Sequence, residues 1–117
     1  MSGPKIRFLQ KPSCTTCRKA KLFLEKQGAI LELRSLDEQP LSEAELDKLI
    51  GERDYLAFLN TRNELYRFRK MKDHPPSRQE AVSLMAANPN LIRRPVVLSG
   101  QHIVLGYDEA AYRAFLR

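Results

Sequence analysis

The chain has 117 residues, of which 43% are hydrophobic and 29% are charged. This length allows one compact domain, and this balance is typical of a folded globular protein rather than a disordered or collagen-like chain. No run approaches the roughly 18 consecutive apolar residues that a membrane helix needs, and residues 1–7 lack the apolar stretch of a secretory signal. We therefore expect a cytoplasmic monomer with one domain over residues 1–117 and no membrane partner.

The charge of the chain is unevenly distributed. The net charge is +6, but residues 5–27 carry seven bases and one acid, whereas residues 32–54 carry eight acids and three bases. A nucleic-acid-binding surface usually presents a continuous basic stripe, so this distribution disfavours direct nucleic-acid binding. A site for a small anion, an acidic partner or an ordinary solvated surface fits at least as well.

The first predicted elements are a strand, a helix and a second strand. Lys5–Leu9 alternates between polar and apolar residues, which indicates a strand. Residues 18–27 follow a hydroxyl-rich entry and end before a glycine, which is typical of a helix. Residues 29–33 are predicted to be the second strand, with Ile30 and Leu31 as its core candidates. A strand–helix–strand unit of this kind forms a right-handed crossover with two parallel strands.

A helical insert is predicted at about residues 40–90. Ser42–Glu45 and Ser77–Glu80 have the sequence of capping boxes, in which serine and glutamate each bind the other's backbone amide. Each box predicts the start of a helix. Residues 55–70 between them have a mostly helical pattern, with an interruption at Asn60-Thr61.

The last predicted elements are a hairpin and a helix. Val96–Leu98 and Ile103–Leu105 form two strands around a Ser-Gly turn. Asp108 caps a closing helix with three residues facing inward, Tyr112, Phe115 and Leu116. The hairpin is antiparallel, so the whole sheet is mixed: a four-stranded α/β fold of the thioredoxin-like (glutaredoxin-like) type with flanking helices. The tyrosines and phenylalanines stand at helix or strand spacing, and we expect them to pack in the core.

Cys14 and Cys17 are the only cysteines and form a C-x-x-C pair where the first strand leads into the helix. Such a pair in a cytosolic chain is typical of a redox site. The free amides and the dipole of a helix N-terminus favour a thiolate, and Arg18 adds positive charge, so we predict that Cys14 is the nucleophile. Cys17 lies one turn further along, where its thiol can attack a mixed disulfide on Cys14.

Two other interpretations of the pair stay open. The cysteines could be small hydrophobic residues that are buried near each other. A zinc site would need His74 and His102 as well, but these histidines lack the spacing of zinc-finger ligands. We favour redox use, with no bound metal and no bound cofactor.

Arg94-Pro95 precedes the third predicted strand. Thioredoxin-like sheets place a cis proline beside the nucleophilic cysteine, so we predict a cis bond here, although only about 5–6% of X-Pro bonds are cis. Arg94 would then lie near Cys14 and bind an oxyanion through its fork of donors. Arg62 in the insert and Arg18 after the cysteine pair are further candidates for anion binding. Arg94 or Arg62 could instead be an ordinary exposed charge. Arg93 is expected to point elsewhere.

Four segments together resemble the ArsC/Spx family: Lys11–Ala20, Leu59–Arg62, Leu91–Val96 and Ile103–Tyr107. The family comprises glutaredoxin-linked arsenate reductases, Spx-type transcription regulators and YffB-like thiol reductases. The resemblance extends over nearly the whole chain, and the distance from the cysteine to the Arg-Pro pair also agrees.

The resemblance implies roles for three residues. Cys14 is similar to the catalytic cysteine that attacks arsenate and is then resolved by glutathione and glutaredoxin. Arg94 is similar to the arginine that holds the oxyanion, and Arg62 is similar to the insert arginine of that site. The arsenate reductases have a further arginine near the last hairpin, where this chain has Leu105-Gly106-Tyr107 instead.

Other features resemble the remaining branches. The C-x-x-C pair followed by Arg18 is closer to the Spx-type regulators, whose disulfide is a switch and whose partner is the C-terminal domain of the RNA polymerase α-subunit. Those regulators have a longer C-terminal extension than follows the last predicted helix here. Gly106–Glu109 with Tyr112 is most similar to the YffB-like branch. We therefore expect a glutathione- or glutaredoxin-linked reductase of oxyanions or disulfides, or alternatively a redox-sensing regulator that binds RNA polymerase.

Overall fold

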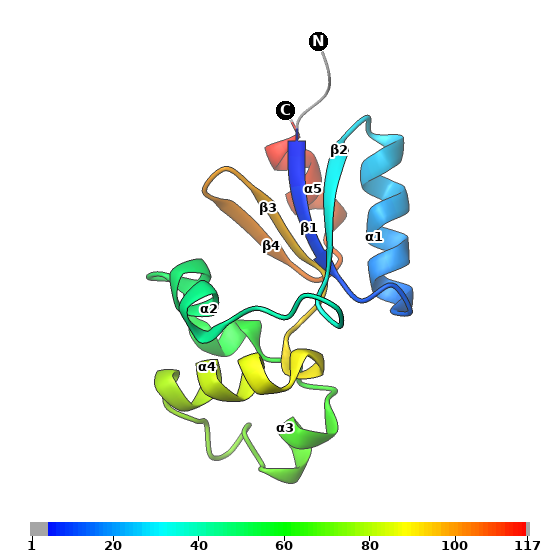
Figure 1. Cartoon of the computed structure of the whole chain (residues 1–117). Helices are drawn as coiled ribbons and strands as arrows, with labels where there is room; N and C mark the ends of the chain where they lie inside the picture. Colours follow the sequence, from blue (N-terminus) through cyan, green and yellow to red (C-terminus); the bar gives the residue numbers. More distant parts are fainter. Residues whose placement is uncertain (1–4, 117) are drawn as a thin grey trace. The chain divides into compact units, whose positions relative to one another are not determined.

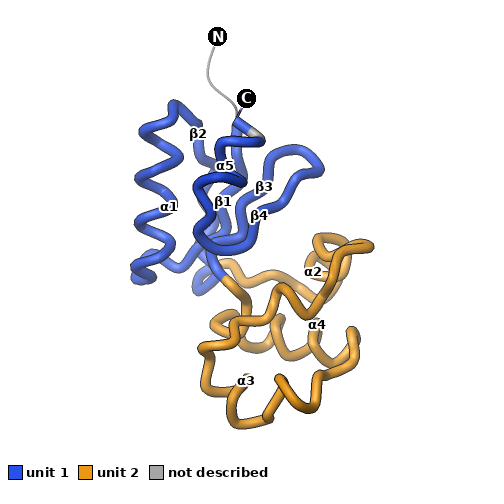
Figure 2. Tube along the Cα trace, turned by 180° about the vertical axis from the view of Figure 1, so that it is seen from behind, with its two compact units in different colours: residues 1–38, 94–117 blue, residues 39–93 orange. Residues whose placement is uncertain are grey.

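The computed structural model describes residues 5–116 apart from the side chain of Phe115, so the inward position expected for that side chain lies outside the described part. The chain divides into two compact units (Figure 2). The first unit comprises residues 1–38 and 94–117, and the second comprises residues 39–93. The second unit corresponds in sequence to the helical insert predicted at about residues 40–90.

The first unit contains four strands and two helices (Figure 1): β1 Lys5–Gln10, α1 Thr15–Lys26, β2 Ile30–Ser35, β3 Val96–Ser99, β4 His102–Leu105 and α5 Glu109–Phe115. The strand order is β2-β1-β3-β4. Strand β1 is parallel to β2 and antiparallel to β3, which is antiparallel to β4. This is the predicted thioredoxin-like mixed sheet.

One face of this sheet packs against α1 and α5. Ile6 and Phe8 of β1 are fully buried, as their alternation predicts, and Phe8 pairs with Val97 of β3. The helices contribute further buried residues to the same cluster: Cys17, Ala20, Leu24 and Tyr112. Full burial of one large apolar side chain stabilises a fold by about 1.5–3 kcal/mol, so this cluster holds the two helices to the sheet.

Strand β2 differs from the sequence prediction. It begins at Ile30, and this side chain is 44% exposed, so its assignment to the core is wrong. Leu33 is 47% exposed, whereas Leu31 packs against the core cluster. The reason is the position of β2 at the edge of the sheet, where only β1 pairs with it. An apolar residue in an edge strand need not be covered on both sides.

The second unit is helical: α2 Glu43–Ile50, the short 3-10 helix η1 Tyr55–Phe58, α3 Glu64–Phe68, α4 Arg78–Ala87 and the 3-10 helix η2 Pro89–Leu91. The predicted interruption at Asn60 is confirmed. Its side chain accepts a hydrogen bond from the Arg62 amide and donates one to the Asn90 carbonyl. Within residues 5–116, none of the helices has both the length and the apolar character required to cross a bilayer.

The two predicted capping boxes differ in the structure. The Ser42 hydroxyl accepts from the Glu45 amide, and the Glu45 carboxylate accepts from the Ser42 amide, each at 3.1 Å. The Ser77 hydroxyl accepts from the Glu80 amide in the same way. The Glu80 carboxylate pairs instead with Arg69 at 3.5 Å. The second box is therefore only half formed, although α4 still begins where it predicts.

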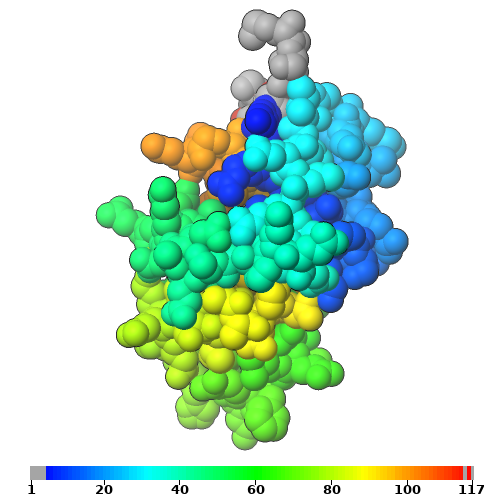
Figure 3. All heavy atoms as spheres, in the orientation of Figure 1, coloured from blue at the N-terminus to red at the C-terminus, as the bar shows by residue number. Residues whose placement is uncertain are grey.

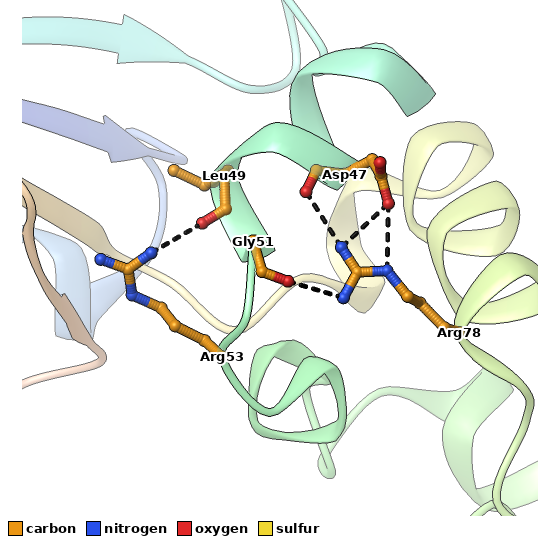
Figure 4. Close-up of polar contacts among 5 residues, drawn as sticks. All are labelled: Asp47, Leu49, Gly51, Arg53 and Arg78. Atoms are coloured by element: carbon orange, nitrogen blue, oxygen red, sulfur yellow. Dashed lines mark hydrogen bonds and ion pairs between the residues drawn. The ribbon is translucent and has the colours of Figure 1, made fainter.

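Arg78 joins the start of α4 to the end of α2 (Figure 4). Its Nε and Nη2 atoms donate to the Asp47 carboxylate, and its Nη1 atom donates to the Gly51 carbonyl at 2.9 Å. The Gly51 carbonyl lies just beyond the C-terminus of α2, where a cation is stabilised by the helix dipole. Arg53 caps the same end by donating to the Leu49 carbonyl (Figure 4).

Phe68 is an exception among the aromatic residues predicted to be in the core. It is 84% exposed, whereas Phe8, Phe58 and Tyr112 are almost fully buried. Helix α3 ends at Phe68, and the chain beyond it turns to bury Met71 instead.

Candidate active site

Cys14 lies between the end of β1 and the start of α1. Its amide donates to the Lys11 carbonyl at 2.9 Å, which closes the loop after the strand. Its carbonyl accepts the first hydrogen bond of the helix, from the Arg18 amide at 3.1 Å. Cys14 is thus the N-cap of α1, with extended backbone angles, and its side chain is half-buried. The sulfur is placed at the positive end of the helix dipole, as predicted.

Cys17 lies one turn further along and is fully buried. It belongs to the core cluster, together with Phe8 and Tyr112. Both cysteines are free thiols in this structure. The pair is therefore asymmetric, because one sulfur is accessible and the other is enclosed by apolar side chains.

The environment of Cys14 favours its thiolate. Partial burial raises the pKa of Cys14, but this effect is outweighed by the amide and thiol of Cys17, the charge of Arg94 and the amide of Thr16. The pKa of Cys14 is lowered as a result. The side chain makes no capping hydrogen bond of ordinary geometry, so these amides act on the sulfur chiefly through their dipoles.

The environment of Cys17 has the opposite effect. Burial raises the pKa of Cys17 to about 12, and its interactions with Cys14 add to the increase. The backbone at Lys11 and the charge of Arg94 oppose this shift but do not cancel it. The site therefore pairs one sulfur whose pKa is lowered with a second thiol that stays protonated at neutral pH.

The positive charge of Arg94 lowers the pKa of both Cys14 and Cys17. The peptide bond between Arg94 and Pro95 is cis, as the sequence predicts. The Arg94 side chain is half-buried, and its Nε atom is enclosed. Arg93 is exposed, and its amide donates to the Phe58 carbonyl at 2.8 Å.

A short chain of hydrogen bonds supports the segment that carries Arg94. The Pro95 carbonyl accepts from the Gly106 amide at 2.9 Å. The Gly106 carbonyl in turn accepts from the Tyr112 hydroxyl at 2.5 Å. Burial raises the pKa of Tyr112, and the neighbouring Cys17 adds to the increase, so the hydroxyl keeps its proton and donates. Tyr112 thus connects the buried cysteine to the proline segment.

Sequence reasoning assigned Tyr112 only to the core and missed this polar contact. The signal was present in the segment Gly106–Glu109 with Tyr112, which carries the resemblance to the YffB-like branch. The rings of Tyr112, Phe23 and Tyr107 also contact one another, with centroids 6.0–6.3 Å apart. Tyr107 donates to the Glu109 carboxylate, and Lys19 lies 5.2 Å from the centre of its ring.

The other two residues predicted to bind an anion are Arg18 and Arg62. Arg18 is exposed on α1, directly after Cys17. Arg62 belongs to the second unit, in the loop between η1 and α3. Their roles in substrate binding stay predictions. No group of three His, Cys, Asp or Glu residues within positions 5–116 is arranged to hold a metal ion.

The asymmetry of the thiols predicts selective alkylation. Iodoacetamide near pH 7 is expected to modify Cys14 alone, because thiolates react and Cys17 is both buried and protonated. Mass spectrometry should find one adduct on the folded protein and two after unfolding. The rate should rise with pH through the pKa of Cys14 and level off with a midpoint below 9.0, the ordinary value for this thiol. Equal labelling of both cysteines in the folded protein would contradict the assignment.

Comparisons with known proteins identify relatives over almost the whole chain. The model of the ArsC family matches residues 9–115. The global transcriptional regulator Spx of Streptococcus mutans is 31% identical over 113 residues, which cover 95% of this chain and 82% of the regulator. An ArsC-family related protein from Bacteroides fragilis has 27% identity and a TM-score of 0.84, with 97% of this chain and 99% of that chain covered. A possible arsenate reductase from Streptococcus mutans has 29% identity and a TM-score of 0.73, with 87% and 90% covered.

Proposed function

This chain belongs to the ArsC family, and we propose that it is a thiol-dependent reductase in which Cys14 attacks the substrate. The observation that carries the proposal is the half-exposed Cys14 sulfur at the N-terminus of α1, with its pKa lowered by the helix and by Arg94. A buried structural cysteine has the opposite properties, since burial in apolar surroundings raises the pKa and blocks access. The proteins similar to this chain include a possible arsenate reductase of known structure and a global transcriptional regulator. Membership of the family therefore does not by itself decide the activity.

For a disulfide substrate, the first step is attack by the Cys14 thiolate on one sulfur. A bond forms between Cys14 and that sulfur, the substrate S–S bond breaks, and the other half leaves as a thiolate that takes up a proton. The electron pair of the broken bond thus leaves with the first product. The charge of Arg94 stabilises the starting thiolate, and in this proposal its guanidinium also binds a carboxylate or oxyanion of the substrate.

Cys17 completes the cycle. Part of its high pKa comes from its interactions with Cys14, and the negative charge on Cys14 disappears once the mixed disulfide forms. The pKa of Cys17 then falls, although burial keeps it above the ordinary value. Cys17 loses its proton as its sulfur attacks the sulfur of Cys14, and the leaving thiolate takes up a proton. That attack forms the Cys14–Cys17 disulfide and releases the second product as a thiol. Two glutathione molecules, or glutaredoxin, would reduce the pair again and become oxidised themselves.

The proposal is tested by assaying the purified protein with glutathione and glutaredoxin on a panel of substrates. The panel contains a glutathione mixed disulfide, a small symmetric disulfide and arsenate. We expect reduction of at least one disulfide substrate and little arsenate reduction, since an apolar Leu105 and a glycine stand where the reductases have a further arginine. Protein alkylated at Cys14 is the matched blank. Activity that is absent over the whole panel, or that survives alkylation, would refute the proposal.

Replacement of Arg94 separates its two proposed roles. Arg94→Ala is expected to raise the pKa of Cys14 and to increase the KM of an anionic substrate by about 10- to 100-fold, because one charge-assisted contact is worth about 1.5–3 kcal/mol. Arg94→Lys should keep the low pKa of Cys14 but not the KM, since lysine lacks the planar fork of donors. The alkylation pH profile and steady-state kinetics measure the two effects. Arg93→Ala is the matched control and should change neither.

A second candidate function is favoured by the curated relatives, which are global transcriptional regulators. In that case the Cys14–Cys17 disulfide would act as a switch, and the C-terminal domain of the RNA polymerase α-subunit would be the partner. A pull-down against that domain with oxidised and reduced protein tests this function. Binding in one redox state would support the regulator, and failure in both states would leave the reductase as the sole candidate.

A further inference from the structure

The second unit has a hollow whose lining residues are distant in sequence from Cys14 and Cys17 and include no cysteine. The hollow has a volume of about 540 Å³ and is lined by six residues: Thr61, Tyr66, Arg67, Lys70, Lys72 and Asp73. All of them lie between η1 and α4, in a segment whose side chains form part of the exposed surface of this unit (Figure 3). This volume is within the range of about 300–1,000 Å³ that is typical of small-molecule sites.

The lining of the hollow carries uncompensated positive charge. Three cations face one carboxylate, that of Asp73. Two other arginines of this unit form ion pairs, Arg78 with Asp47 and Arg69 with Glu80. In contrast, Arg67, Lys70 and Lys72 form no ion pair with a carboxylate of residues 5–116. Three like charges around one cavity repel one another, and a bound anion relieves this repulsion.

Lys70 occupies a backbone position that normally belongs to glycine. Helix α3 ends in a Schellman motif, in which the Met71 amide donates to the Tyr66 carbonyl and the Lys70 amide donates to the Arg67 carbonyl, each at 3.1 Å. Lys70 has a φ of 52° there. Helix α1 ends in the same motif with Gly28 at a φ of 85°, which is the favoured residue in this region. A residue other than glycine at this position is expected where function requires its side chain.

We propose that this hollow binds a nucleotide-class ligand, an aromatic base joined to a phosphate. Arg67 supplies a fork of donors for phosphate oxygens, and Lys70 and Lys72 supply point charges. Tyr66 is half-buried in the same lining, and an aromatic side chain of this kind can stack on a base. Carboxylate ligands satisfy the charges but make no use of the ring, which is why a base-bearing phosphate is the better fit.

Calorimetric titration with AMP, with adenosine and inorganic phosphate as separate arms, tests this site. We expect AMP to bind at least about tenfold more tightly than either part alone, because both the charges and the ring contribute. Arg67→Ala should weaken AMP binding about tenfold, whereas Lys48→Ala, which removes an exposed charge of the same unit outside the hollow, should leave it unchanged. The Cys14→Ser variant should bind AMP like the wild type, so failure of the reductase proposal would not affect this result.

Lys70→Gly gives the sharpest outcome. Glycine relieves the backbone strain at φ 52° and removes one cation. The variant should therefore melt at a higher temperature and bind AMP more weakly, a combination that a purely structural role of Lys70 does not produce. The proposal is overturned if Lys70→Gly keeps full affinity, if AMP causes no heat at millimolar concentration, or if adenosine alone binds as well as AMP. Much tighter binding of an oligonucleotide, with NMR shifts spread beyond the hollow, would also overturn it.

Discussion

Cys14→Ser is expected to reduce disulfide reduction to the uncatalysed rate, whereas Cys17→Ser should leave the first chemical step intact. The difference follows from the two pKa values. That of Cys14 is lowered and that of Cys17 is raised to about 12. A thiol with the latter pKa is ionised to about one part in 10⁵ at pH 7, and only the thiolate is nucleophilic. Cys17 therefore cannot replace Cys14 as the attacking group.

The two serine variants are best compared by mass spectrometry after brief mixing with a disulfide substrate. Cys17→Ser should accumulate a mixed disulfide on Cys14, since the resolving thiol is absent, and excess glutathione should release it. Cys14→Ser should form no adduct. The wild type should show only the Cys14–Cys17 disulfide. A stable adduct on Cys17 in the Cys14→Ser variant would reverse the assigned roles.

The position of Cys14 at the start of a helix could be predicted from the sequence because its setting is local. A strand, four loop residues and a helix start place Cys14 at the helix N-terminus whatever surrounds them. The cis bond at Pro95 was predicted from the fold type, and the structure confirms it. The sheet topology followed in the same way, since the order of strands and helices allows few arrangements.

The remaining features depend on contacts between distant segments. The high pKa of Cys17 comes first from burial, and the cluster around it combines β1 with α5, about a hundred residues apart in the chain. The exposure of Ile30 results from the edge position of β2, which its own residues do not encode. The left-handed backbone at Lys70 could not be predicted, because sequence rules place glycine there.

Tyr112 is expected to make the largest single contribution to stability among the residues near the site. It is fully buried against α1 and the sheet, and truncation of a buried aromatic residue to alanine costs about 3–5 kcal/mol. Whole domains are stable by about 5–15 kcal/mol, so Tyr112→Ala should unfold at a much lower urea concentration. Tyr112→Phe keeps the ring and leaves the Gly106 carbonyl without its hydroxyl donor, which costs about 1–3 kcal/mol.

The phenylalanine variant also tests whether Tyr112 positions the site. Loss of the bond to Gly106 loosens the contact between Gly106 and Pro95 and with it the placement of Arg94. The pKa of Cys14 should therefore rise in Tyr112→Phe, which shifts the alkylation profile to higher pH. Tyr55→Phe is the matched control, because it also removes a tyrosine hydrogen bond to a backbone carbonyl, that of Pro76, but in the second unit. If both variants lose similar stability and neither changes the reactivity of Cys14, Tyr112 serves the core alone.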